Sequence, residues 1–242
     1  MEGKIGKQRL NDYKTPLMRA LLTLAALFSV INCVAQNREV EIQFVPTYNS
    51  KEVFFEETWY ELPSGDSIIF DVFKCYISDL AFYSKGKKVL SEPESFHLLN
   101  SETNLSFSLS LPAAIDYDAI HFNFGIDSAT SNSGALGGDL DPAKGMFWTW
   151  QSGYINSKIE GRSNLCPTRH HEFAFHLGGY ASPDNALQYV SLSVKPAKVI
   201  RVEIPLDKFV TGINLKKQHS IMSPGPEAVA LSKKLAGSLQ SR

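Results

Sequence analysis

The chain has 242 residues, of which 43% are hydrophobic and 20% are charged, a composition typical of one globular domain with short appendages. Its formal net charge is −1, and no basic cluster with interleaved aromatic residues occurs, so the charge pattern argues against nucleic acid as a partner. The GxSxG, HExxH and phosphate-loop signatures are also absent from the sequence. These patterns argue against the hydrolases and nucleotide-binding enzymes that such motifs identify.

The N-terminus has the pattern of an export signal. Arg19 precedes an apolar run over residues 20–31, which is too short to span a bilayer as a helix. Cys33-Val34-Ala35 then places small residues where a signal peptidase cuts, which predicts a mature chain that begins at Gln36. A second interpretation is a lipoprotein signal ending at Cys33, although the residues before it fit a lipobox poorly. Both interpretations predict a protein of the periplasm or cell envelope without a membrane span.

Two cysteines, Cys75 and Cys166, remain in the predicted mature chain. In an oxidising compartment they could form one disulfide. Cys75 lies in an apolar run, however, and fits equally well as a small buried hydrophobic residue. Neither cysteine belongs to a CxxC pattern, so a thiolate metal site has no support.

Residues 39–204 read as short strands separated by glycine and proline turns. The expected strands are Glu39–Phe44, Trp59–Leu62, Ser67–Tyr76, Ile77–Tyr83, Val89–Leu90, Ser95–Leu99, Leu105–Leu111, Ala119–Ile126, Tyr154–Glu160, Phe173–Leu177, Gln188–Val194 and Val199–Ile204. Pro46 is expected to end the first strand. This pattern predicts an all-β fold, an antiparallel β-sandwich of the immunoglobulin-like or a similar type.

The last segment of the chain has a different period. After Pro226, apolar residues recur at helical spacing and predict a short C-terminal helix. The residues of this stripe are Ala228, Val229, Leu231, Leu235 and Leu239. The helix is expected to dock on the sandwich. We therefore divide the chain into an N-terminal extension with signal peptide (1–35), a β-sandwich domain (36–215) and a tail with a helix (216–242).

The stretch Gly145–Tyr154 concentrates two of the three tryptophans of the chain. If it forms one strand, then Met146, Trp148 and Trp150 share a face. The indole rings would then serve as core filler, or an exposed ring would serve as a stacking platform for a carbohydrate. The preceding segment 128–145 is longer than a structureless connection usually is, and such loops are often functional.

Histidine is the residue type here that suits a soft or borderline metal such as copper. His176 lies near the end of the expected strand Phe173–Leu177, which a glycine pair follows, whereas His97 and His219 are weaker candidates. A single histidine is more often a satisfied core or rim residue than a ligand. His121 alternates with Ile120 and Phe122, so it is expected on a solvated face and outside any metal site.

Several segments between about Val40 and Val194 together resemble the MbnP-like family, which is named after a methanobactin-associated periplasmic protein. They occur in the order Asp127, a Gly-rich loop, Leu140-Asp141-Pro142, Met146-Phe147-Trp148-Thr149-Trp150, Gly153-Tyr154 and Phe175-His176-Leu177-Gly178. The resemblance implies an exported β-sandwich that binds copper for uptake or handling and is not itself an enzyme. It further implies a copper site of histidines and a tryptophan oxidised to kynurenine, an oxidation attributed to a dihaem cytochrome-c-peroxidase-like partner.

Carried over to this chain, the resemblance places the modified tryptophan within Met146–Trp150, and His176 matches the histidine of the His-Leu-Gly strand. Where copper-binding members have another histidine, this chain reads Ser131-Asn132-Ser133-Gly134. His97 or His219 would have to take that place. The metal site is therefore expected among His176, Trp148, Trp150, His97 and His219. Two alternatives stay open: a structural or recognition sandwich without metal, and a carbohydrate-binding module that uses Trp148 or Trp150.

Overall fold

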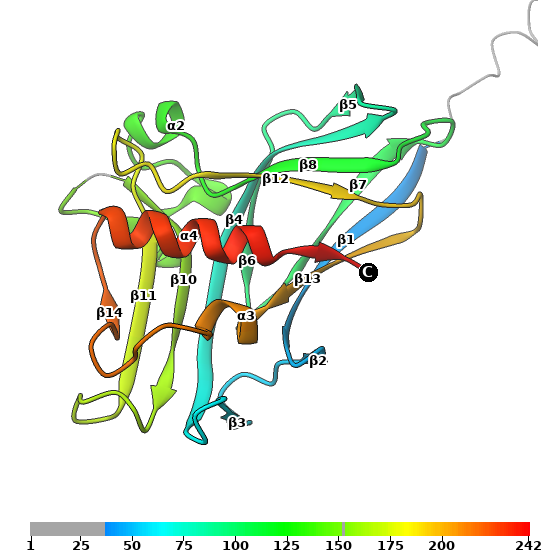
Figure 1. Ribbon diagram of the computed structural model, residues 1–242. Helices are drawn as coiled ribbons and strands as arrows, with labels where there is room; N and C mark the ends of the chain where they lie inside the picture. Colours follow the sequence, from blue (N-terminus) through cyan, green and yellow to red (C-terminus); the bar gives the residue numbers. More distant parts are fainter. Residues whose placement is uncertain (1–36, 152) are drawn as a thin grey trace, which may run out of the picture. The chain divides into compact units, whose positions relative to one another are not determined.

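The computed structural model describes residues 37–151 and 153–242 (Figure 1). The expected extension and signal peptide, including Cys33, therefore lie outside the described residues. Contacts between residues divide the chain into two units, residues 1–38 with 111–114 and residues 39–110 with 115–242. Of the first unit, only residues 37–38 and 111–114 are described. The following account concerns the second unit.

Two β-sheets form this unit. The smaller sheet has the order β15-β13-β1-β2, with β7 also paired to β1. Its strands are β1 (Asn37–Tyr48), β2 (Lys51–Glu52), β7 (Ser106–Pro112), β13 (Val199–Pro205) and β15 (Gln240–Ser241). The larger sheet has the order β12-β8-β4-β10-β11-β14, and β3, β5, β6 and β9 pair at its sides. Its strands are β3 (Tyr60–Glu61), β4 (Ser67–Ser84), β5 (Lys87–Ser91), β6 (Phe96–Asn100), β8 (Ala119–Phe124), β9 (Phe147–Trp148), β10 (Gly153–Ser163), β11 (Glu172–Gly178), β12 (Gln188–Ser193) and β14 (Ser220–Ile221).

The expected all-β class is confirmed. Two ladders, β1 with β13 and β11 with β14, are parallel, so the sheets are mixed rather than purely antiparallel. Aromatic rings fill the space between the sheets: Phe44 of β1 meets Phe122 of β8 edge-on, with ring centroids 5.8 Å apart. Such edge-to-face pairs stabilise a core beyond the area that they bury.

Two expected strand ends are wrong. Residues 67–84 form one 18-residue strand, β4, without the polar break expected after Tyr76. This central strand has partners along both edges, and those pairings override the local polar residues. Pro46 does not end β1, which continues to Tyr48. Proline lacks only a donor, and the Pro46 carbonyl still accepts from the Val53 N–H at 2.9 Å.

Helices cover part of the larger sheet. The predicted C-terminal helix is confirmed as α4 (Pro226–Ser238), which lies across β11 (Figure 1). Its buried side chains include Ala228, Leu231 and Leu235, three members of the expected stripe. A second short helix, α3 (Leu206–Val210), was not expected, because five residues are too few to show a helical period. Its Phe209 ring packs against Phe175 of β11.

The connection over residues 128–145 is ordered by local caps. It contains α2 (Ser128–Asn132) and the 3₁₀ turns η1 (Gly138–Leu140) and η2 (Pro142–Lys144). The carboxylate of Asp127 accepts from the Thr130 N–H and caps α2. Asp141 caps η2 in the same way through Ala143 N. These caps fix the path of the chain up to the tryptophan stretch.

Cys75 and Cys166 are both buried and free. The Cys166 N–H donates to the carbonyl of Ser163, so Cys166 lies close to Ser163. Ser163 in turn is paired with Ile68 of β4. Cys75 lies seven residues further along β4, about 23 Å at the rise of a strand. A disulfide requires Cα atoms within about 7 Å, so this geometry forms none. Burial raises the pKa of the Cys75 thiol well above its usual range.

Candidate metal centre

The tryptophan stretch forms a hairpin and not the single strand that alternation suggests. Trp148 ends β9 and pairs with Gly153 at the start of β10. Because the chain turns between these residues, Trp148 is 6% exposed whereas Trp150 is 63% exposed. The expected single strand, with Trp148 and Trp150 on one face, is therefore wrong. Their ring centroids are nevertheless 5.9 Å apart, at an interplanar angle of 50°.

Trp148 belongs to a buried apolar cluster, which we call the hairpin cluster. Its members are Tyr76, Ile126, Leu140, Met146, Trp148, Tyr154 and Ile155. The Tyr154 hydroxyl donates to the Leu140 carbonyl and accepts from the Leu136 N–H, both at 3.0 Å. Tyr76 donates to the Asp139 carbonyl, also at 3.0 Å. The cluster thus ties the connection before the hairpin to the sheet.

His176 lies on β11 with its side chain directed away from α3. Phe173, Phe175 and Leu177 occupy the other face of this strand and are buried. His176 is itself only 7% exposed, and its Nε2 lies 2.5 Å from Oε1 of Glu160 on β10. The hydrogen bond with His176 lowers the pKa of the Glu160 carboxyl below its usual value.

This pairing decides which imidazole nitrogen can bind a metal. An ionised carboxylate only accepts hydrogen bonds, so Nε2 of His176 is protonated and donates its N–H to Glu160. In a neutral ring the other nitrogen, Nδ1, then keeps its lone pair. Carboxylate–histidine–metal arrangements of this kind orient the ring and raise its basicity as a ligand.

Gly178 brings Trp148 to the same face of β11 as His176. A Cβ atom at Gly178 would lie 2.7 Å from Cζ3 and 2.9 Å from Cη2 of Trp148, so the indole rests directly on this glycine. Residues two apart on a strand point the same way and are about 7 Å apart. The structure therefore brings His176 and Trp148 together, and a side chain at Gly178 would separate them.

Lys158 lies directly opposite His176 in the β10–β11 ladder. Its ammonium donates to the Gly145 carbonyl at 2.7 Å, at the turn that precedes Met146. Burial lowers the pKa of this amine below its usual value. The positive charge is thus held at the base of the hairpin, and Glu160 supplies the opposite charge beside the imidazole.

The two weaker histidine candidates do not join His176. His97 on β6 is bonded to Glu92 at 2.8 Å, and its ring stacks on Phe107 with centroids 3.6 Å apart. Strands β4 and β10 lie between β6 and β11. Since neighbouring strands are about 4.8 Å apart, three steps separate His97 from His176 by about 14 Å.

His219 precedes β14, which runs parallel to β11. Its carbonyl accepts from the Ala174 N–H at 2.8 Å, and Ser220 pairs with Ala174. Because side chains alternate along a strand, His219 lies on the opposite face from Ala174 and His176. Within residues 37–151 and 153–242, no three His, Cys, Asp or Glu side chains gather as a metal site. The metal donor that this geometry leaves open is therefore Nδ1 of His176, and imidazole suits copper or zinc.

Glu160 and Gly178 are the site residues that sequence reasoning did not single out. The sequence places Glu160 at the end of an expected strand, and only the β10–β11 register brings it to His176. Gly178 was noted as a strand end, whereas its role is to accommodate an indole. A glycine inside a strand pattern is the available signal, since it often marks close approach of another group.

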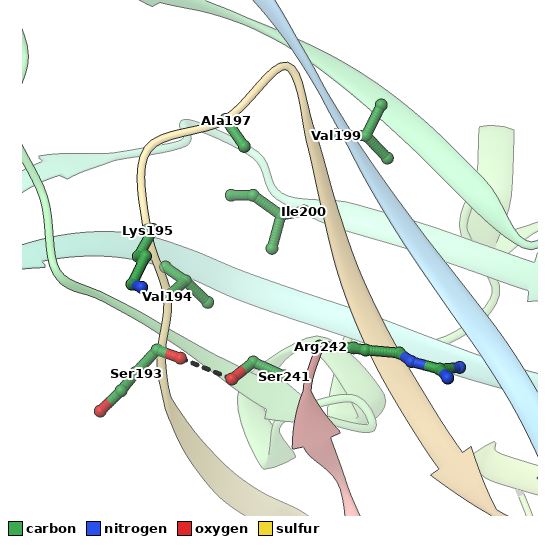
Figure 2. Close-up of a pocket in the computed structure, with 8 residues that line it drawn as sticks. All are labelled: Ser193, Val194, Lys195, Ala197, Val199, Ile200, Ser241 and Arg242. Carbon is green, nitrogen blue, oxygen red and sulfur yellow. Dashed lines mark hydrogen bonds between the residues drawn. The ribbon is translucent and has the colours of Figure 1, made fainter. Parts of the chain in front are cut away.

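A separate pocket of about 450 Å³ lies between the β12–β13 connection and β15 (Figure 2). The residues that line it are Ser193, Val194, Lys195, Ala197, Val199, Ile200, Ser241 and Arg242. Ser241 Oγ donates to the Ser193 carbonyl at 2.6 Å across it. The lining has no imidazole, thiol or carboxylate side chain, so this pocket is not a metal site.

The fold and the site together define a class of two-sheet β-proteins in which a tryptophan hairpin rests on a histidine-bearing strand. The chain belongs to the MbnP family, whose sequence model matches residues 37–223. The resemblance expected from the sequence is thereby confirmed.

Among solved structures, the chain is similar to MbnP from Methylosinus trichosporium, with a TM-score of 0.59 and 16% sequence identity. The alignment covers 74% of this chain and 80% of that one, and at this identity it shows the shared fold. No curated protein sequence matches the chain. In the described part of the chain, no helix has the length and apolar character needed to cross a membrane.

Proposed function

We propose that this protein is an exported copper-binding protein that serves in copper uptake or handling. The observation that carries the proposal is the contact of Trp148 with Gly178, two residues from His176 on the same face of β11. Glu160 holds Nε2 of this imidazole and leaves Nδ1 for a metal. Membership of the MbnP family supports copper as the metal.

The protein acts in this proposal as the substrate of a haem enzyme and not as an enzyme. A dihaem cytochrome-c-peroxidase-like partner oxidises one tryptophan to kynurenine. Trp148 is the preferred residue, because its ring lies beside the histidine strand. Trp150 is the exposed neighbour, with its ring centroid 5.9 Å away. Kynurenine carries an aryl amine in place of the indole N–H, which adds a nitrogen donor next to His176.

The test compares protein exported by the native cell with protein made without the dihaem partner. Intact mass measures the loss of one carbon and gain of one oxygen, and peptide mapping assigns the change to Trp148 or Trp150. Copper per chain is measured on the same samples. We expect modified protein to bind copper more tightly than unmodified protein. Native protein with two intact tryptophans in this hairpin, or without affinity for copper, would contradict the proposal.

The N-terminus of the exported protein completes this proposal. We expect it near Gln36, with the protein in the periplasm. N-terminal sequencing of the exported form distinguishes this start from an acylated Cys33, which would instead anchor the protein to a membrane.

A carbohydrate-binding module remains a second candidate, favoured by one observation. Trp150 is 63% exposed, as a stacking platform for a sugar ring requires. Binding of oligosaccharides by the wild type and by Trp150→Ala tests it. Sugar binding that Trp150→Ala abolishes, in a wild-type protein without affinity for copper, would favour this function over copper handling.

A further inference from the structure

The edge of the larger sheet next to His176 is formed by β14. Ser220 pairs with Ala174 and Ile221 pairs with Phe175, in parallel. Ile221 is buried on the same side as Phe175, whereas Ser220 is exposed on the side of Ala174. The alternation of the two strands is therefore in phase.

β14 ends at Ile221, and the same register continued by one residue would put Met222 beside His176. The chain is fixed on both sides of this position. Before it, Ile221 is held in the ladder; after it, the Cβ of Pro224 lies 3.1 Å from where a Cβ of Gly179 would be. The segment therefore follows β11 past His176. In this continued register, Met222 would share the face of His176, at the usual strand separation of about 4.8 Å.

Met222 differs from the other described methionine, Met146. Met146 is completely buried in the hairpin cluster, where it packs as a core side chain. Met222 is 47% exposed and does not belong to the hairpin cluster. A thioether is a soft, uncharged donor that selects copper(I) over harder divalent ions.

We propose that Met222 supplies a thioether ligand to a copper(I) ion that Nδ1 of His176 also binds. This inference rests on the proposed function and names a ligand for it. Glu160 on one side fixes the imidazole, and Met222 on the other side completes the donor pair. Residues 131–134 read Ser-Asn-Ser-Gly and supply no histidine, so the second ligand has to come from another segment. Such a pair is soft and uncharged, so the site prefers copper(I) to copper(II) and zinc.

The experiment measures copper(I) affinity by competition with a chromophoric copper(I) chelator, using the whole mature protein as it is exported. The variants are Met222→Leu, His176→Ala and, as a matched control, Met146→Leu. Loss of an outer-shell partner alone costs about 10–100-fold in metal affinity. We therefore expect Met222→Leu to weaken copper(I) binding at least about tenfold. Met146→Leu should leave it unchanged, and circular dichroism confirms that each variant folds.

A second measurement reads the ligand directly. Silver(I), a redox-inert substitute for copper(I), is titrated into protein labelled at the methionine methyl groups. The Met222 methyl resonance should shift as the metal binds, whereas that of Met146 should not. The thioether assignment is wrong if Met222→Leu binds copper(I) as tightly as the wild type and the Met222 methyl resonance of the wild type does not shift. If copper(I) binding still depends on His176 in that case, the proposed function stands. If wild-type protein binds no copper(I), both fail.

Discussion

Two histidines of the larger sheet look alike in the sequence and differ in the structure. His176 on β11 and His121 on β8 each alternate with buried phenylalanines, and each is hydrogen-bonded to a side chain of the next strand. The partner of His176 is the carboxylate of Glu160, bonded at Nε2. The partner of His121 is the hydroxyl of Tyr189, bonded at Nδ1.

The partner determines what each imidazole can do. A carboxylate fixes the proton on one ring nitrogen, whereas a phenol can donate or accept and fixes neither tautomer. The His121 ring is stacked on Tyr83 with centroids 3.7 Å apart, so its neighbours are aromatic. His176 instead lies beside a carboxylate, and the Trp148 indole rests on Gly178, two residues further along the same strand. A histidine becomes a credible ligand through the groups that surround it, and the alternating pattern does not encode these.

The largest contrast is expected in stability. Trp148→Ala removes a ring that is 6% exposed and rests on Gly178, so it should lower the free energy of unfolding by about 3–5 kcal/mol. Tyr189→Ala, in the His121 region, removes a ring that is 64% exposed and should change it by no more than about 0.5 kcal/mol. Urea unfolding of both variants measures this difference. Equal losses would show that the hairpin ring is not part of a rigid core.

The next contrast is in copper affinity. His176→Ala removes the one imidazole of the proposed site and should weaken copper binding by more than about 100-fold, the upper end of the range for outer-shell changes. Trp148→Phe, which cannot become kynurenine, should weaken it as well. His121→Ala should not change it. Isothermal competition titrations measure the wild type and all three variants, each purified from cells that contain the dihaem partner. Wild-type affinity in His176→Ala would remove this histidine from the site.

The strands and the C-terminal helix could be predicted because their periodicity is local. Ile120, Phe122 and Phe124 mark one face of β8, and the stripe after Pro226 marks one face of α4. The hairpin could not be predicted in this way. Trp148 and Trp150 obey strand alternation, and only the pairing of Trp148 with Gly153 shows that a turn separates their environments.

The candidate site could be predicted only in part, for a related reason. The family resemblance singled out His176 and the tryptophan stretch, but the positions of His97 and His219 depend on strand order and register. His97 lies three strands away from His176, and His219 lies on the opposite face of the sheet. Glu160 comes from a different strand, so its approach to His176 is a property of the sheet and not of the local sequence.

A smaller effect should follow from changing the partner and leaving the ligand in place. Glu160→Gln keeps the size of the side chain but offers a carbonyl and an amide to Nε2, so the imidazole is no longer held in one tautomer. Copper affinity should fall about tenfold, as for other outer-shell changes. Tyr189→Phe makes the corresponding change at His121 and should have no effect. Nitrogen-15 spectra of the imidazoles report the tautomers without copper. A single unchanged His176 tautomer in Glu160→Gln would contradict this role.

The smallest effect separates the two regions by pH. Burial lowers the pKa of His121 below histidine's usual 6.5, so the unfolded chain binds a proton there that the folded protein does not. The stability that this contributes is present above pH 6.5 and is lost as the pH falls through the lowered pKa.

The hydrogen bond with His176 lowers the pKa of Glu160, so the stability that Glu160 contributes is present above its usual pKa of 4.5 and is lost only in more acidic solution. His121→Asn should therefore flatten the dependence of the unfolding midpoint on pH below 6.5, and Glu160→Gln should flatten it below pH 4.5. Thermal unfolding at constant ionic strength measures both profiles. If His121→Asn changed only the more acidic window, burial would not be what governs this imidazole.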